Sequence, residues 1–405
     1  MKTIHRAWLV CAGCALLYFC TSGLAVNAFM VYQPYILVQN GLSNTQSSSL
    51  ITVRNLCSFL TMFLSGVYYD KLSLRSGMLL AGLMTAGGFL CFGLARSYPA
   101  YCAAAALVGF SYGLGTTIPV AMVLGRWFHR KFKLALSICS SVTGLSTLGL
   151  PTLITWLIEN RSLRFAFTAE AVLIAVLVLL SFLLVRSSPA SVGMEPYGWG
   201  AESEAEEQRH PQPHLLTRRR WIPVILMLLF LGGMTNVGYS HLTVRITTEG
   251  FDSYTAAAAV TLSGIFLMLS KFLYGELTER YGCYRVNWLF GAVLLLGLGL
   301  CAMPLPGKGR MFLAVSAYSV GVAMTSLGLA AWAGDWSSHA EYEKTVRVFQ
   351  IGYAAGSLLF GTVPGLLADR FGGSYRPAYL LMTVFAAAVM GVTQWLYALR
   401  ERGGK

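Results

Sequence analysis

Twelve apolar runs, each of about 20 residues and long enough to cross a hydrocarbon core of about 30 Å, constrain this chain more than any other feature. Hydrophobic residues make up 56% of the sequence and charged residues 12%, about half the charge of a soluble domain. The pattern predicts an all-α membrane protein with twelve transmembrane helices. The runs lie near residues 7–38, 47–69, 76–97, 99–125, 132–158, 164–185, 220–245, 254–277, 284–305, 310–333, 346–368 and 375–399.

The loops on the two sides of the membrane differ in basic content. If both termini lie on one side, that side holds 20 Lys and Arg residues and the other side holds 8, with Arg245 counted among the 8. The positive-inside rule then places both termini in the cytoplasm, in a plasma (inner) membrane. The first run is longer than the core of a signal peptide, so we expect it to remain as a helix. The net charge of +13 needs no nucleic acid, because anionic lipid attracts juxtamembrane Lys and Arg.

A polar stretch at 186–219 divides the runs six and six. It is rich in glutamate, arginine and proline and poor in apolar residues, which is typical of a flexible cytoplasmic linker. The predicted domains are therefore an N-terminal six-helix bundle at 1–185 and a C-terminal six-helix bundle at 220–405. Nothing in the composition indicates an oligomer, and we expect a monomer.

Cysteine and histidine give no sign of catalysis or metal binding. The nine cysteines lie almost entirely within apolar runs, so they form no disulfide framework. Cys11 and Cys14 have redox or metal spacing, but small packing residues explain them better at this depth. The six histidines are scattered. The sequence therefore predicts no enzyme, no metal and no cofactor.

A charged loop motif occurs once in each half of the chain. Each copy has a glycine, an acid four residues later, a base next to the acid, and an arginine about a turn further on. Glycine permits close helix approach, the acid can cap a helix N-terminus, and the bases bind the inner surface. We expect a charge latch that breaks as the halves move. The residues are Gly66, Asp70, Lys71 and Arg75, and Gly275, Glu279, Arg280 and Arg285.

With twelve spans, this repeated motif resembles the major facilitator superfamily over the whole chain. The basic segment from Arg126 to Lys133, followed by Gly144, Gly149 and Pro151, resembles the signature of the oxalate/formate antiporter and monocarboxylate transporter branch. The resemblance implies two pseudo-symmetric six-helix bundles, a substrate site at midplane between them, and transport by alternating access. Arg126 is then expected among the gating residues.

Lys271 is the single charge in the apolar run 256–274. A cation in hydrocarbon costs several kcal/mol unless it faces water, a partner or an anionic ligand. In the family branch, an arginine four residues before the motif glycine binds the substrate carboxylate, and Lys271 holds that position. Lysine offers a point charge where arginine offers a planar fork, so we expect a carboxylate of unspecified identity. The alternative is a structural cation that is bonded to helix ends or snorkels inward.

Further candidates follow from the same resemblance. The pocket positions carry Thr117, Thr143, Gly321 and Thr325 where oxalate transporters have aromatic residues, which predicts a wider site for a larger or hydroxylated acid. Gly352 or Tyr353 stands near the second cation of those transporters. Asn27 is a polar residue at mid-span in the first run.

Arg54 lies within the second run, with no acid within a helical turn. We expect it to face the central cavity and to replace the second cation. The alternative is that it snorkels to the outer surface or donates to backbone carbonyls.

The coupling ion and the type of transport stay open. Leu267 stands where proton-coupled carriers of the branch have an aspartate, which favours exchange or uniport. Glu170, in the run 165–184, can carry a proton or can form an interfacial hydrogen bond. The sequence predicts a transporter of a small organic anion, a mono- or dicarboxylate, acting as antiporter or symporter. The alternatives are a proton-coupled drug or metabolite exporter and a ligand sensor that does not transport.

Overall fold

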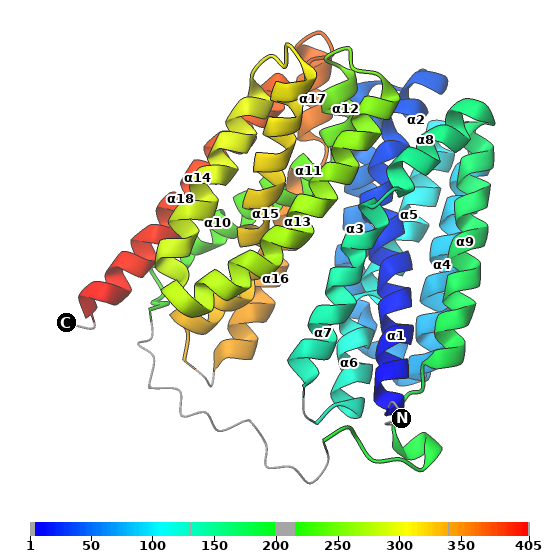
Figure 1. Cartoon of the computed structure of the whole chain (residues 1–405), viewed down its shortest axis with the longest axis vertical. Helices are drawn as coiled ribbons and strands as arrows, with labels where there is room; N and C mark the ends of the chain where they lie inside the picture. Colours follow the sequence, from blue (N-terminus) through cyan, green and yellow to red (C-terminus); the bar gives the residue numbers. More distant parts are fainter. Residues whose placement is uncertain (1–4, 130, 199–214, 339–340, 404–405) are drawn as a thin grey trace. The chain divides into compact units, whose positions relative to one another are not determined.

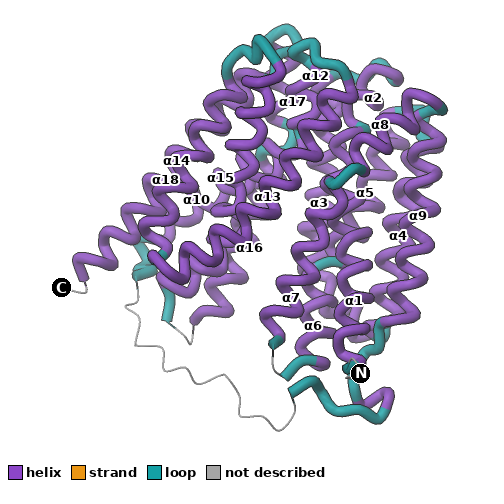
Figure 2. Tube along the Cα trace, viewed as in Figure 1, coloured by secondary structure: helices purple, strands orange, loops and turns teal. Residues whose placement is uncertain are grey.

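The computed structural model describes residues 5–129, 131–198, 215–338 and 341–403, and these are almost entirely helical (Figures 1 and 2). Two compact units divide the chain: unit 1 is Met1–Asn40 with Val53–Gln208, and unit 2 is Gly41–Thr52 with Arg209–Lys405. In the described part, 11 spans are long and apolar enough to cross a membrane, and the bent helix α3 makes a twelfth. The predicted all-α membrane fold is confirmed. The middle of the predicted linker, 199–214, lies outside the described residues.

Unit 1 contains the first six spans. Its elements are α1 (Arg6–Tyr18), η1 (Phe19–Ala28), η2 (Phe29–Val31), α2 (Gln33–Gln39), α3 (Asn44–Lys71), α4 (Leu74–Leu94), α5 (Tyr98–Gly115), α6 (Thr117–Trp127), α7 (Phe132–Ser141), η3 (Val142–Thr147), α8 (Leu150–Asn160), α9 (Leu163–Leu184) and η4 (Ala190–Val192).

Local sequence explains where the helices of unit 1 begin. The Ser73 and Ser162 side chains accept hydrogen bonds from Ser76 N and Phe165 N, which satisfies free N–H groups at the starts of α4 and α9. Helix α4 packs against both α9 and α5. At one end of this packing, Phe89, Phe92 and Phe167 form an aromatic cluster with Tyr32.

Unit 2 contains the last six spans. Its elements are α10 (Trp221–Gly232), η6 (Gly233–Val237), α11 (Gly238–Ser240), α12 (Leu242–Thr247), α13 (Ser253–Tyr281), α14 (Cys283–Ala302), α15 (Lys308–Trp336), α16 (Tyr342–Leu359), α17 (Val363–Arg370) and α18 (Arg376–Gly403). Helix α15 packs against α13 and α14, and α14 packs against α18.

The first turns of α3, up to Thr52, belong to unit 2, and only the rest of the helix belongs to unit 1. The Asp369 carboxylate accepts hydrogen bonds from the backbone and side chain of both Asn44 and Thr45, at 2.5–3.0 Å. His241 Nε2 bonds to Ser48 Oγ at 2.8 Å. Asp369 therefore caps the N-terminus of α3.

Several spans are interrupted, which the apolar runs did not predict. The first span contains the π-helical segment η1, and the seventh contains the π-helical segment η6. The fourth span breaks at Thr116, just before Pro119, and the fifth turns through η3 to Gly149, whose φ is 79°. Such interruptions free backbone groups inside a membrane protein and are frequent at functional sites.

Candidate functional site

Three of the predicted binding residues lie at the interruptions of unit 1. Asn27 belongs to η1, Thr143 belongs to η3, and Thr117 is the first residue of α6. The Asn27 Nδ2 group donates a hydrogen bond to the Thr143 carbonyl oxygen at 3.3 Å, so the structure brings these two residues together. The signals for the breaks in the fourth and fifth spans were Pro119, Gly149 and Pro151.

The threonine hydroxyl groups at these breaks already have protein partners. Thr117 Oγ1 lies 2.9 Å from the Tyr18 hydroxyl oxygen, and Thr143 Oγ1 donates to the Ser140 carbonyl at 2.8 Å. Thr117 is exposed and Thr143 is half-buried. A ligand would therefore meet paired hydroxyl groups at both positions.

Arg54 is a buried cation in unit 1, on α3. Its residue is 5% exposed, and its Nη2 atom has no hydrogen-bond partner among the described residues. No ion pair to a described acid is found either. Tyr112 on α5 is close enough to interact with it electrostatically. This burial excludes the alternative in which Arg54 snorkels to the surface.

Two glycines on α5 fix the position of Arg54. A side chain at Gly109 would collide with the Arg54 carbonyl oxygen, and one at Gly113 would collide with Thr61. Glycines four residues apart allow α3 and α5 to approach closely, as small residues do at membrane helix contacts. The Arg54 backbone is therefore held against α5.

Lys271 is half-buried on α13 in unit 2. Its ammonium group forms no hydrogen bond or ion pair within residues 5–129, 131–198, 215–338 and 341–403. The next turn of α13 carries Tyr274, which bonds to Asn287 Oδ1 at 2.8 Å and ties α13 to α14. Lys271 thus lies on a fixed helix with an uncompensated charge.

The other candidate residues of unit 2 take part in helix packing to different degrees. Thr325 is fully buried on α15 and donates to the Val322 carbonyl in its own helix at 2.8 Å. A side chain at Gly321 would collide with Leu294 on α14, and one at Gly352 would press on Leu228. Tyr353 is half-buried on α16, where its carbonyl accepts the Ser357 hydroxyl group.

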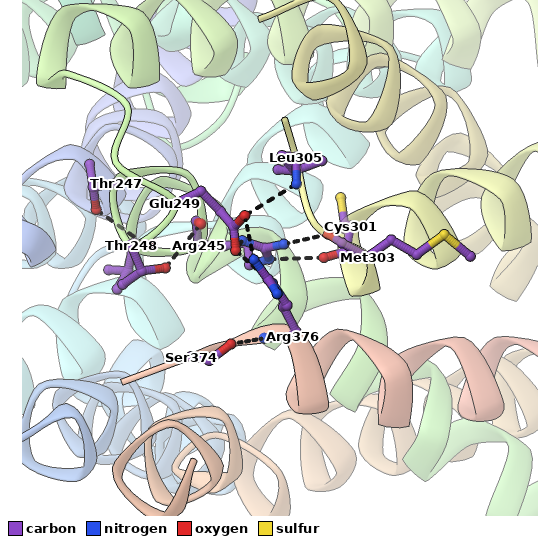
Figure 3. A network of polar contacts seen from close by, with 10 residues as sticks. Arg245, Thr247, Thr248, Glu249, Cys301, Met303, Leu305, Ser374 and Arg376 are labelled. Atoms are coloured by element: carbon purple, nitrogen blue, oxygen red, sulfur yellow. Dashed lines mark hydrogen bonds and ion pairs between the residues drawn. The ribbon is translucent and has the colours of Figure 1, made fainter. Parts of the chain in front are cut away.

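Sequence reasoning missed a buried ion network in unit 2, drawn in Figure 3. Arg245, counted above as an outer loop residue, lies in α12 and is fully buried. Its Nε donates to the Cys301 carbonyl at 2.9 Å and its Nη2 to the Met303 carbonyl at 2.8 Å. Its Nη1 forms an ion pair with Glu249 Oε1 at 2.7 Å, without the alignment of a hydrogen bond.

The Glu249 carboxylate completes this network. Arg376 Nε and Nη2 donate to its two oxygens at 2.8 and 2.9 Å, and Leu305 N donates to Oε2 at 3.1 Å. Burial by itself would raise the pKa of Glu249, but these bonds and the Arg245 charge lower the pKa to about 2. The network joins α12, the loop after α14, and the start of α18, so its role is structural.

The latch residues differ between the two units. Arg75 Nε donates to the Phe182 carbonyl at 3.1 Å near the end of α9, and its guanidinium lies 3.9 Å from the Phe182 ring centroid. Arg280 contacts the Tyr281 ring at 5.4 Å. Most of the other residues are exposed, Gly275 is half-buried, and none makes a side-chain bond within the described part of the chain. They are Gly66, Asp70, Lys71, Arg126, Gly275, Glu279 and Arg285.

Asp335 forms a separate polar contact at the end of α15. It pairs with Arg400 Nη1 at 3.0 Å and accepts the Tyr397 hydroxyl group at 2.7 Å. Both partners lie on α18. This contact fastens two helices of unit 2 and leaves the Asp335 carboxylate compensated.

Comparisons with known proteins agree with this fold. The family model of the Major Facilitator Superfamily matches residues 14–325 and 248–405. Monocarboxylate transporter 12 of Rattus norvegicus is 22% identical over 95% of this chain and 84% of its own length. An aspyridones efflux protein of Emericella nidulans is 22% identical over 95% of this chain and 75% of its own length.

Solved structures show the same fold at low identity. The crystal structure of a nucleoside transporter superposes with a TM-score of 0.75 at 14% identity, over 97% of this chain and 100% of that chain. That of a D-xylose-proton symporter gives a TM-score of 0.72 at 14% identity, over 94% of this chain and 95% of that chain. The family match covers most of the sequence, and the chain belongs to the Major Facilitator Superfamily of membrane transporters.

Proposed function

We propose that this chain is a secondary transporter that moves a small organic anion, a mono- or dicarboxylate, across the membrane by alternating access. The observation that carries the proposal is Arg54, a buried guanidinium that has an unpartnered nitrogen and, among the described residues, no acid beside it. A buried charge without a partner is costly, so its retention in a membrane helix favours a role in binding an anion. Lys271 supplies a second uncompensated cation in unit 2.

The named relatives support a carboxylate substrate. Monocarboxylate transporter 12 matches this chain over nearly its whole length. We extend the proposal to two six-helix bundles, 1–185 and 220–405, and to cytoplasmic termini in a plasma membrane, as the basic residues favour. Asn27, Thr117 and Thr143 would line the site in unit 1, and Thr325 and Tyr353 in unit 2.

Export of a larger product is the second candidate function. The efflux protein of Emericella nidulans matches this chain at the same identity as the rat relative, and that observation favours it. The two functions differ in what the cations do, because only an anion gains from Arg54 and Lys271. Competition by neutral compounds of the same shape would favour the exporter.

The experiment that tests the proposal is uptake of labelled lactate and succinate by liposomes containing the full chain. Lys271→Gln and Arg54→Gln should each abolish saturable uptake, and Lys271→Arg should keep part of it, because the charge is retained. Lys308→Gln is the matched control: Lys308 is an exposed lysine of the same unit and should not affect uptake. Wild-type uptake by the Lys271→Gln and Arg54→Gln proteins would contradict the proposal.

The charged loop motif carries a proposal of its own. Asp70 and its equivalent Glu279 are exposed acids, each followed by a base, and we assign them to a latch that favours one of two transport states. Asp70→Asn should raise the reactivity of cysteines introduced near Arg126 toward a membrane-impermeant thiol reagent. Unchanged reactivity would count against the latch.

A further inference from the structure

A buried carboxyl group in unit 1 has no cation beside it. Glu170 lies on α9, about two turns after the helix begins. The residue is 6% exposed; its Oε2 accepts a hydrogen bond from the Tyr32 hydroxyl group at 2.5 Å, and its Oε1 has no partner. This environment differs from that of Glu249, which two arginines hold in its ionised form.

The elements around Glu170 supply no compensating charge in the described part of the chain. Helix α9 packs against α1, η1, α4 and α8. Besides Tyr32, the Cys20 thiol of η1 lies close enough for the Glu170 charge to act on it. Glu159 of α8 bonds to Tyr35, Cys91 of α4 is exposed, and Arg164 of α9 itself is exposed. An ionised carboxylate here would cost several kcal/mol, so this environment favours a bound proton.

A cavity near this group offers a path for proton exchange. It has a volume of about 370 Å³ and lies at the end of unit 1 that is remote from the amino terminus, between the end of α4 and the start of α9. Phe92 lines the cavity and stacks on Phe167, with ring centroids 5.5 Å apart. Phe167 in turn stacks on Tyr32 at 4.0 Å. The rings of Phe92 and Phe167 therefore lie between the cavity and the Tyr32–Glu170 pair, and proton exchange requires these two rings to move apart.

The rim of the cavity is basic and polar. Arg96 and Arg164 line it together with Asn40 and Tyr101, whose side chains bond to each other at 3.1 Å. Neither arginine pairs with an acid among the described residues. Polar groups and this volume are enough to hold water, which would serve as proton donor and acceptor next to the aromatic rings.

We propose that the Tyr32–Glu170 pair is a proton-binding site that exchanges with this cavity, and that one proton crosses the membrane with each carboxylate anion. Glu170 changes from carboxylate to carboxylic acid when it takes up a proton from water. It returns that proton on the other side, so with a monocarboxylate such as lactate no net charge moves and no other reactant is consumed. The inference rests on the proposed anion transport and names its coupling ion, in place of the exchange or uniport that the sequence favoured.

The test is lactate uptake by liposomes with an inward tenfold proton gradient and no membrane potential. A coupling of one proton per anion should let the wild-type protein accumulate lactate about tenfold. Glu170→Gln keeps the shape of the neutral acid, so it should exchange lactate for lactate but accumulate none. Glu159→Gln is the matched control, because Glu159 forms the same kind of pair with Tyr35 at an exposed position.

Three results would overturn the proton site. One is full gradient-driven accumulation by Glu170→Gln. Another is wild-type lactate uptake that does not depend on the proton gradient. This result would be compatible with the proposed anion transport. The third comes from infrared spectra, where the band of a protonated carboxyl group should appear as the wild-type protein is acidified and be missing in Glu170→Gln. An identical spectrum in both proteins contradicts the site whatever the substrate, whereas absence of all carboxylate uptake contradicts only the proposed function.

Discussion

Arg54 in unit 1 and Arg245 in unit 2 are both buried arginines, and their surroundings are opposite. Arg245 donates to two backbone carbonyls and pairs with Glu249 (Figure 3). Arg54 keeps an unpartnered Nη2 and has no acid beside it in the described part of the chain. A buried arginine therefore has a structural role where its bonds are satisfied, and is a candidate for ligand binding where they are not.

The difference also gives the two residues opposite expected effects on stability. Removing one partner from a buried, satisfied charge network leaves other groups unpaired, which destabilises the fold. Removing an unpaired buried charge leaves nothing unpaired and ends a desolvation cost. Substitution of Arg245 in unit 2 should therefore lower stability, whereas substitution of Arg54 in unit 1 should impair transport without lowering stability.

The largest effect is expected for Arg245→Met. It leaves the carbonyls of Cys301 and Met303 without their donor and removes one cation from Glu249, so it should lower the free energy of unfolding by about 3–5 kcal/mol. Thermal unfolding in detergent measures this. Arg376→Met should cost less, because the Arg376 side chain is 42% exposed. Equal melting temperatures for Arg245→Met and wild type would contradict the structural role assigned to Arg245.

Arg54→Met should have the opposite sign. Its melting temperature is expected to equal or exceed the wild-type value, and its free energy of unfolding to be higher by up to about 1 kcal/mol. The reason is that the cost of burying an unpaired charge is removed. Uptake of lactate by the same protein should be lost. A destabilised Arg54→Met that still transports would assign Arg54 to the structure alongside Arg245.

The pH dependence of stability, through Glu249 of unit 2, provides a third test. Glu249 is expected to have a pKa of about 2 when folded and about 4.5 when unfolded, so its ionised form contributes stability above pH 4.5. That contribution should be lost as the pH falls from 4.5 toward 2. Glu249→Gln should be less stable at neutral pH and should lose less stability on acidification. Parallel unfolding curves for the two proteins would contradict the network.

The smallest effect is expected at the Asp335–Arg400 pair, whose side chains are 22% and 31% exposed. Exposed or partly exposed ion pairs contribute about 0–1 kcal/mol. Arg400→Gln should therefore change the melting temperature far less than Arg245→Met does. A loss of stability as large as that of Arg245→Met would mean that burial does not determine how much these ion pairs stabilise the fold.

The sequence predicted features whose cause is local. Apolar runs predicted the spans, and a charge within an apolar run made Lys271 and Arg54 candidates for the site. Pro119, Gly149 and Pro151 marked two interruptions, and the sequence analysis did not use them as such. No proline marks η1 or η6, so the π-helical segments had no comparable signal.

The remaining features depend on contacts that only the fold creates. Arg245 ends its apolar run and was counted as a loop residue, although Glu249 four residues later was a signal for an ion pair. Arg376 joins Glu249 from a point 127 residues further along. The Tyr32–Glu170 pair spans 138 residues, so the sequence left open whether Glu170 was bonded or carried a proton.

Binding of an anion at Arg54 is the central claim, and binding of lactate compared with lactamide tests it most directly. Lactamide is a neutral molecule of nearly the same shape, so a difference in affinity reports on charge. Calorimetric titration of the purified protein should show lactate binding to the wild type and to Arg161→Gln, an exposed control in unit 1, and weak binding of lactamide. Arg54→Gln should lose the preference for lactate, whereas an unchanged preference in Arg54→Gln would contradict the claim.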